Sequence, residues 1–459
     1  MKIVAKQGSC ADAPAGYVRV AFTDKPKGTK RFVEKNGIET LEIGIGTEAA
    51  THRQFIILCR SIIATAKAHK VKKIALELPD LTDERAQIAA ENFEMANYEF
   101  NHFKTKPKEG WAEVEEVLLY CSSLKSIEAA IKKGQEIGKG VNACRTLANT
   151  PGGDITPSTL AKAAKEAVKG LPVKVTTLGE KEMAKLGMGA LLGVAKGSSE
   201  KPTFTIMEYN GSKDAPIVLV GKGVTFDSGG LNLKPSNGIY EMHMDMSGAA
   251  SVIHAVTLAA KLKLKKHVIG LVPAVENMPG NNAYRPGDVL KSLSGKTIEV
   301  INTDAEGRLI LADALTYAKR LKPAVVLDVA TLTGAALSAL GLYASALLTR
   351  DDALANRVSV CGEASGDYVW RLPLWEEYED LIKGTFADVA NIASGAGGRY
   401  GGAIEGGVFL WQFAKELECP WAHIDIAPRM TAAPKEELSK GAAGAPVRLL
   451  LRFVEQWTK

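Results

Sequence analysis

Residues 217–223 read Ile-Val-Leu-Val-Gly-Lys-Gly, four apolar residues that run directly into a glycine-rich turn carrying a lysine. An apolar run without polar alternation predicts a strand that is buried on both faces. Similar runs occur before and after it, mostly separated by helical segments. They are Phe204–Met207, Val268–Val272, Ile298–Ile301, Val325–Val329, Ala346–Leu348 and Ala422–Ile426. This α/β pattern predicts a mostly parallel central sheet covered by helices on both faces.

Two further parts of the chain precede this region. Within residues 1–122, short apolar runs alternate with helix-like stretches at 51–69 and 82–98, which predicts a small N-terminal α/β domain. Its apolar runs are Val18–Phe22, Leu41–Ile45, Ile74–Leu78 and Glu116–Tyr120. Residues 123–149 are predicted to form one connecting helix that ends at a Pro-Gly-Gly stop signal, and residues 150–459 form the larger domain. Two domains also suit a chain of 459 residues.

The composition argues against several classes of protein. The net charge of +5, from 57 basic and 52 acidic residues, is too small to favour binding to nucleic acid or to a membrane surface. The six cysteines include no Cys-x-x-Cys pair, which favours a reducing compartment, and the N-terminus lacks the apolar core of a signal peptide. The uncharged segment Val329–Leu348 is punctuated by Thr, Ser and Gly, as in a strand, turn, helix and strand. We therefore expect a soluble, cytoplasmic protein.

Two clusters of chemically active residues follow the strand at 217–220. Glycines at 221–230 place Lys222, Asp227 and Lys234 on an expected tight loop, although the spacing is not that of a phosphate-binding P-loop. A solvated surface turn is the alternative for this segment. Asp245 lies among methionines, with Met242 nearby, immediately before a small-residue helix at 247–260. An acid in such apolar surroundings either caps the helix or ligates a cation.

The third cluster occupies residues 302–309, Asn-Thr-Asp-Ala-Glu-Gly-Arg-Leu, after an expected strand at 296–301. If the backbone stays extended, alternate side chains share one face, namely Asn302, Asp304, Glu306 and Arg308. Two adjacent carboxylates repel unless a proton or a cation lies between them, and hard oxygen ligands suit Zn, Mn or Mg. Arg308 lies near the start of a helix at 309–320, where it could hold an anion. A structural ion pair with the two acids is the alternative.

Together the clusters supply four carboxylates from different strand ends, Asp227, Asp245, Asp304 and Glu306. A two-metal hydrolase needs such acids because each bridging carboxylate neutralises two cations. The chain has neither a His-Glu-x-x-His zinc motif nor a Gly-x-Ser-x-Gly nucleophile elbow. The residues alone therefore predict metal-dependent hydrolysis at the ends of the strands.

These motifs closely resemble those of the leucyl aminopeptidase family, whose members are cytosolic di-metal exopeptidases. The resemblance covers roughly residues 140–455, and its carriers are 221–234, 244–250, 276–280, 284–288, 302–309, 331–334 and 386–388. It implies that Lys222, Asp227, Asp245 and Glu306 hold the tighter metal ion. It also implies that Asp227, Asp304 and Glu306 hold an exchangeable one, assisted by the backbone carbonyl of Asp304. Residues 1–122 show no matching motif, in agreement with the variable N-terminal domain of that family.

The resemblance implies the remaining roles as well. Lys222 would ligate as a neutral amine, Lys234 would stabilise the oxyanion, and Arg308 would hold a bicarbonate ion. This bicarbonate would act as general base for a hydroxide that bridges two divalent ions, Mn or Zn, with Mg or Co as alternatives. The side-chain pocket and backbone clamp would consist of Met242, Asn302, Thr331, Leu332 and Gly334. The substrates would be peptides with a free N-terminus, and leucine-like first residues would be preferred.

Family membership further implies a homohexamer, a dimer of trimers with active sites that face an inner cavity. One departure is Ala445, where many relatives carry arginine, and it lies outside the metal ligands. A DNA-binding regulator that keeps the aminopeptidase fold, a catalytically inactive scaffold, and a cysteinyl-glycine dipeptidase that uses the same site are the alternatives.

Overall fold

The computed structural model describes residues 1–35, 37–48, 50–393 and 400–458. The chain forms two compact units. The first comprises Met1–Asn142 and Ala432–Lys440, and the second comprises Ala143–Thr431 and Gly441–Lys459. The division falls inside the long helix α3 (Leu124–Asn149) and returns a segment near the C-terminus to the first unit. It therefore differs from the limits of 122 and 149 inferred from the ends of the helix signal.

A six-stranded sheet forms the centre of the first unit, in the order β1-β6-β5-β2-β4-β3. All neighbouring strands run parallel except β3 and β4. The strands are β1 (Lys2–Gln7), β2 (Val18–Thr23), β3 (Lys30–Lys35), β4 (Ile38–Gly44), β5 (Lys73–Glu77) and β6 (Glu116–Cys121). Helix α1 (His52–Ala68) connects β4 to β5, which pair on either side of β2, and α2 (Asp83–Asn97) connects the parallel neighbours β5 and β6. The predicted small α/β fold of this region is confirmed.

Helix α3 lies against α2 within the first unit because two glycines, one turn apart, remove side chains from the contact. A Cβ atom on Gly134 would lie 2.2 Å from the carbonyl oxygen of Gln87. A Cβ atom on Gly138 would lie 2.7 Å from the carbonyl oxygen of Glu91. No side chain fits at such distances. The glycines therefore let the backbones of α2 and α3 approach closely, and this packing offsets their poor helix propensity.

A nine-stranded sheet forms the centre of the second unit, in the order β16-β15-β18-β14-β9-β11-β8-β7, with β10 paired to β11. Strands β18, β14, β9, β11 and β10 are parallel, whereas β15 and β8 pair antiparallel with β18 and β11. The strands are β7 (Val173–Leu178), β8 (Thr203–Asn210), β9 (Ile217–Gly221), β10 (Gly223–Asp227), β11 (His267–Asn277), β14 (Val325–Ala330), β15 (Ser345–Leu348), β16 (Val369–Arg371) and β18 (Trp421–Asp425). The predicted mostly parallel sheet is confirmed, with antiparallel strands toward its edges.

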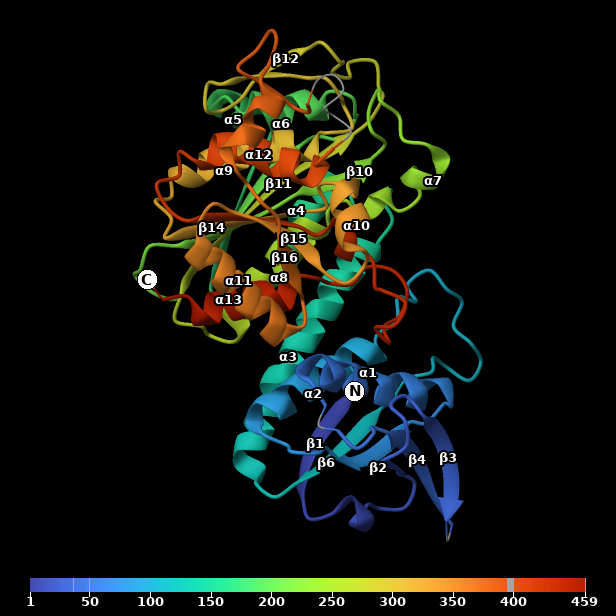
Figure 1. Ribbon diagram of the computed structural model, residues 1–459. Helices are drawn as coiled ribbons and strands as arrows, with labels where there is room; N and C mark the ends of the chain where they lie inside the picture. The colour runs from blue at the N-terminus through green and yellow to red at the C-terminus, as the bar shows by residue number, and fades with distance from the viewer. Residues whose placement is uncertain (36, 49, 394–399, 459) are drawn as a thin grey trace. The chain divides into compact units, whose positions relative to one another are not determined.

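Helices cover both faces of this sheet (Figure 1). Helices α6 (Gly189–Ala195), α9 (Gly307–Lys319) and α12 (Gly402–Ala414) lie on one face, and α8 (Ser247–Lys261), α11 (Asp352–Ser365) and α13 (Val447–Gln456) lie on the other. The remaining α-helices of this unit are α4 (Pro157–Ala167), α5 (Glu180–Leu186), α7 (Ser236–Ile239) and α10 (Gly334–Leu340). This coverage explains why the central strands are mostly apolar: all five residues of β9, for example, are buried.

One predicted strand has a different place. The apolar run Ile298–Ile301 does not join the central sheet; its first part belongs to β13 (Thr297–Glu299) in a separate three-stranded sheet with β12 (Val289–Lys291) and β17 (Val389–Ala390). The prediction was wrong because an apolar run reports burial, and Ile298 and Val300 are fully buried in the core without belonging to the central sheet.

The uncharged segment Val329–Leu348 forms the end of β14, a turn, α10 and β15, which confirms the prediction of strand, turn, helix and strand. Within the described ranges, no helix is both long enough and apolar enough to cross a membrane.

Candidate metal centre

Lys222 lies at the break between β9 and β10, and its backbone is fixed on two sides. Its N–H donates to the carbonyl of Val329 at 3.0 Å, and its carbonyl accepts the N–H of Ala249 at 2.8 Å. The first contact ties it to β14 and the second to the start of α8. The side chain is buried, and its Nζ donates to the carbonyl of Thr331 at 2.9 Å. The lysine is therefore held inside the protein, which excludes the solvated surface turn for this residue.

Asp227 ends β10, which pairs in parallel with the end of β11. The sequence predicted one tight loop through this segment, and that prediction was wrong for residues 223–227, which form a strand. Gly223 permits the pairing, because a Cβ atom there would lie 2.5 Å from the carbonyl oxygen of Pro273. The tight turn begins only afterwards, at Gly229 and Gly230, whose φ angles are +85° and +63°. Asp227 is thus a buried acid at the carboxyl end of a strand.

Asp245 follows a short 3-10 helix (Met242–Met244) and precedes α8. It does not cap α8: the N-cap residue is Met246, and no side chain makes a capping hydrogen bond there. One carboxylate oxygen of Asp245 instead accepts the hydroxyl of Thr331 at 2.6 Å, and the other lies 2.8 Å from Lys222 Nζ. The capping alternative is therefore wrong, and the acid faces Lys222.

The segment from Asn302 to Glu306 is a turn and not the extended strand that the sequence suggested. The side-chain oxygen of Asn302 accepts the backbone N–H of Asp304 at 2.8 Å. Glu306 has helical backbone angles, φ −82° and ψ −34°, and α9 begins at the next residue. The argument from alternating side chains was therefore wrong, although Asp304 and Glu306 do lie in the same site.

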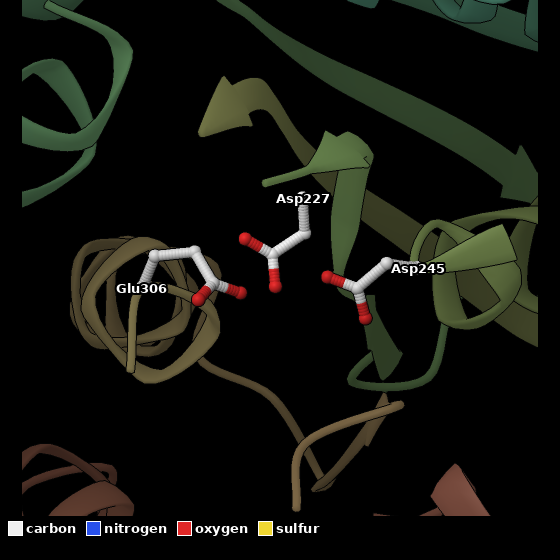
Figure 2. A group of neighbouring side chains, drawn as sticks. All are labelled: Asp227, Asp245 and Glu306. Carbon is white, nitrogen blue, oxygen red and sulfur yellow. The ribbon is translucent and has the colours of Figure 1, made fainter. Parts of the chain in front are cut away.

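The carboxylates of Asp227, Asp245 and Glu306 point toward one another (Figure 2). Each offers one oxygen, and these three oxygens lie within 4.8 Å of one another, with all three residues buried. Two lysines lie among the acids. Lys222 Nζ is 2.8 Å from Asp245 and 2.9 Å from Glu306, and Lys234 Nζ is 2.8 Å from Asp227 and also contacts Asp304. Three distant segments thus bring their charges to one point.

Burial and mutual repulsion control protonation in this cluster. Burial raises the pKa of Asp227 to about 6, and the charge of Glu306 adds to the rise. Burial opposes ionisation of Glu306 as well, but Lys222 and Lys234 lower its pKa. For Lys222, burial lowers the pKa while Asp245 and Glu306 raise it, and the net pKa is raised. With only protein groups present Lys222 is therefore an ammonium, and it must lose a proton to serve as the neutral ligand that the family implies.

The donor set fits a divalent cation. Among the described residues, Glu306 Oε2 is a buried carboxylate oxygen with no hydrogen-bond partner, and such an atom is costly unless a cation occupies its free side. Clustered carboxylate oxygens are hard ligands of the kind that Mn, Mg and Zn accept. The residues present thus match the implied metal.

Two residues behind the acids orient them. The side-chain amide of Asn277 donates to Asp227 at 2.8 Å and to the carbonyl of Thr303 at 2.9 Å. The hydroxyl of Tyr284 donates to the same Thr303 carbonyl at 2.7 Å. They fix Asp227 and the turn that carries Asp304. Sequence reasoning missed both roles, although both residues lie within segments that resemble the family.

Arg308, in the first turn of α9, is buried and does not pair with the cluster acids. Its Nη1 donates to Glu405 at 2.8 Å and to the backbone carbonyl of Asn391 at 2.6 Å. The sequence left open an ion pair between Arg308 and the two acids beside it. Arg308 does form an ion pair, but its partner is Glu405 on α12. No local signal in the sequence links Glu405 to Arg308, because the two residues are 97 positions apart.

A cavity of about 290 Å³ opens onto the cluster. The four acids and two lysines of the cluster and Arg308 line it, and so do the predicted pocket residues Met242, Thr331, Leu332 and Gly334. Asn302 does not line the cavity, because its side chain serves the turn. Three apolar residues that the sequence did not suggest complete the wall, namely Leu337, Ala427 and Met430.

Two models of known families match the chain. The catalytic domain of the cytosol aminopeptidase family matches residues 142–451, and the N-terminal domain of the same family matches residues 21–107. The chain belongs to the cytosol aminopeptidase family. The resemblance to leucyl aminopeptidases inferred from the motifs is thereby confirmed, and the first unit, in which we recognised no motif, also matches. Membership places the chain among hydrolases that act as aminopeptidases.

Individual relatives agree with this assignment. A probable cytosol aminopeptidase of Roseiflexus castenholzii is 45% identical over 410 residues, which cover 86% of this chain and 83% of the relative. One of Aromatoleum aromaticum is 52% identical over 340 residues, which cover 74% of this chain and 66% of the relative.

Solved structures of similar proteins share the whole fold. A variant of tomato leucine aminopeptidase has a TM-score of 0.89 at 30% identity and covers 99% of this chain and 96% of its own. The bottromycin maturation enzyme BotP, in complex with Mn, has a TM-score of 0.86 at 31% identity and covers 99% of each chain.

Proposed function

We propose that the protein is a metal-dependent aminopeptidase that releases the first residue from peptides with a free N-terminus. One observation carries the proposal: three buried carboxylates from separate segments place oxygens within 4.8 Å of one another beside two lysines and a cavity. Buried carboxylates at such distances repel one another, and a divalent cation bound among them relieves that repulsion. The Mn complex of BotP, a similar protein, supports the choice of a divalent ion.

The ligands follow from the family pattern. Lys222, Asp227, Asp245 and Glu306 hold one ion, and Asp227, Asp304 and Glu306 hold the other. The ions are Mn or Zn, with Mg or Co as alternatives. When bound, divalent cations lower the pKa of a coordinated water and polarise a carbonyl group. Asn277 and Tyr284 keep Asp227 and the Asp304 turn in place for this purpose.

Lys234 supplies positive charge on the cavity side of the cluster. Burial would lower the pKa of Lys234, but Asp227, Glu306 and Asp304 raise it, so the side chain is an ammonium at neutral pH. Lys234 lines the cavity, where its charge stabilises the oxyanion of the tetrahedral intermediate formed from a peptide carbonyl. Arg308 lines the same cavity and holds the bicarbonate that accepts the proton of the attacking water.

The wall of the cavity favours apolar first residues. Met242, Leu337, Ala427 and Met430 surround it with apolar atoms, and methionine side chains adapt to branched or linear partners. Peptides that begin with leucine or methionine therefore fit best. The names of the relatives support a cytoplasmic location, and the resemblance to leucyl aminopeptidases implies a homohexameric assembly, which we propose as well.

Substitution of Glu306 tests the proposal most simply. Glu306→Gln keeps the size of the side chain but removes the charge shared between the two ions, and we expect it to abolish hydrolysis of leucyl amide. A matched control is Asp313→Asn, which changes a buried acid of α9 whose oxygens accept backbone N–H groups, among them those of Leu191 and Leu293. The control should keep most of the activity. Full activity in the Glu306 variant contradicts the proposal.

A further inference from the structure

A buried carboxylate faces Arg308 from behind the cavity. Glu405, in the first turn of α12, is 4% exposed, and Arg308 is 5% exposed. One oxygen of Glu405 accepts Arg308 Nη1 at 2.8 Å, and its other oxygen accepts the backbone N–H of Ala393 at 3.0 Å. Both carboxylate oxygens are thus bonded, so Glu405 is held in one orientation.

The remaining contacts fix the guanidinium. Nη1 also donates to the backbone carbonyl of Asn391 at 2.6 Å, and the guanidinium carbon lies 6.0 Å from the ring centre of Phe409. In the described part of the chain, Nε and Nη2 of Arg308 make no hydrogen bond, and Arg308 lines the cavity whereas Glu405 does not. The guanidinium therefore bonds to the protein through Nη1, and Nε and Nη2 remain as hydrogen-bond donors for a ligand in the cavity.

The charge of Glu405 reduces the electrostatic attraction between Arg308 and that ligand. A carboxylate at hydrogen-bond distance compensates most of the guanidinium charge, and solvent does not screen a buried pair as it screens a surface pair. A small anion that reaches Arg308 from the cavity then gains hydrogen bonds but little net attraction, and it is also repelled by Glu405 behind the guanidinium.

We propose that Glu405 is a positioning residue that holds Arg308 toward the cavity and weakens its affinity for a small carboxylate-like anion, bicarbonate in particular. This inference rests on the proposed role of Arg308 as an anion holder. The pair thus sets how tightly the anion binds, while Arg308 alone contacts it.

The test is anion binding without catalysis. The metal-loaded full-length protein is titrated with sodium bicarbonate at constant ionic strength and pH, without substrate, and its unfolding temperature is followed. Glu405→Gln keeps a hydrogen-bond acceptor but removes the charge. We expect the half-saturating bicarbonate concentration to fall on the order of tenfold relative to the unmodified protein. Glu405→Ala provides the same charge removal should the glutamine variant fail to fold.

Two controls separate this effect from a general loss of packing. Asp367→Asn breaks another buried ion pair, that of Asp367 with Arg448, and should destabilise the protein without tighter bicarbonate binding. Adding Arg308→Ala to Glu405→Gln should remove the gain. The inference is overturned if Glu405→Gln binds bicarbonate no more tightly than the unmodified protein, or if the gain survives without Arg308. Because no substrate is present, these outcomes do not depend on whether the aminopeptidase function holds.

Discussion

Gly307 shows at the scale of one residue how closely the site is packed. A Cβ atom there would lie 2.6 Å from both Cε and Nζ of Lys222. Real side chains do not approach so closely, so the lysine would have to leave its position between Asp245 and Glu306. The glycine is required by the lysine beside it and not by an unusual backbone angle.

Gly307→Ala should therefore displace Lys222 and reduce leucyl amide hydrolysis by about tenfold or more, because overpacking of about 1–3 kcal/mol acts directly on a metal ligand. The matched control is Gly153→Ala, where nothing lies within 4 Å of the added Cβ atom. Steady-state kinetics of both variants at saturating metal check the prediction. Equal activity in the two variants would show that Lys222 does not need its observed position.

Residue types predicted most of the site, but not its geometry. The four acids and two lysines were identified because charged side chains do not belong in an apolar core. Near expected buried strands, they therefore indicate a functional role. The arrangement of Asp304 and Glu306 was predicted for the wrong reason, since the turn at Asn302 replaces the expected strand. Glu405 could not be found from the sequence, because its contact with Arg308 joins two helices that no local pattern relates.

At the scale of elements, the turn between β14 and α10 forms one wall of the cavity. The carboxylate of Asp425, at the end of β18, accepts the N–H of Leu332 at 3.0 Å and the hydroxyl of Thr333 at 2.7 Å. The hydroxyl of Thr333 also accepts the N–H of Ala336 and so caps α10. The neighbouring parallel strands thus hold the turn that carries Thr331 and Gly334.

Thr333→Ala removes both contacts and should lower the free energy of unfolding by about 1 kcal/mol, the usual cost of losing an N-cap. It should also raise KM for leucyl amide more than it lowers kcat, because Thr333 lines the cavity while its hydroxyl bonds to Asp425 and Ala336 and not to a metal ligand. Thr333→Ser keeps the hydroxyl and should restore both values. A variant that loses kcat alone would argue against a substrate-binding role for this turn.

Elements were predicted well where burial and sheet membership coincide. The strands that became β9, β11, β14 and β18 are mostly apolar because helices cover both faces of the sheet. The pattern failed at β13, which is buried outside the central sheet, and at β10, where glycine and threonine obscured a strand. Hydrophobicity indicates that a segment is buried, but it does not indicate which strands pair with each other. The strand pairing is seen only in the folded chain.

At the scale of the whole molecule, the second unit brings residues from widely separated parts of the chain to the carboxyl ends of parallel strands. Ligands of open α/β sheets bind at this edge, because successive strands end there in flexible turns. Among the described residues, those that form the metal cluster and line the cavity beside it all belong to the second unit. The chemistry therefore belongs to the second unit, and the central claim concerns the metal ions that its acids hold.

Titration of metal into metal-depleted protein tests that claim most directly. The full-length protein is stripped with a chelator and dialysed, and Mn²⁺ or Zn²⁺ is then added while bound metal and leucyl amide hydrolysis are measured on the same samples. Our account predicts no turnover in the stripped protein, and full activity once about two ions per chain are bound. Unchanged hydrolysis by protein that holds no metal would contradict it.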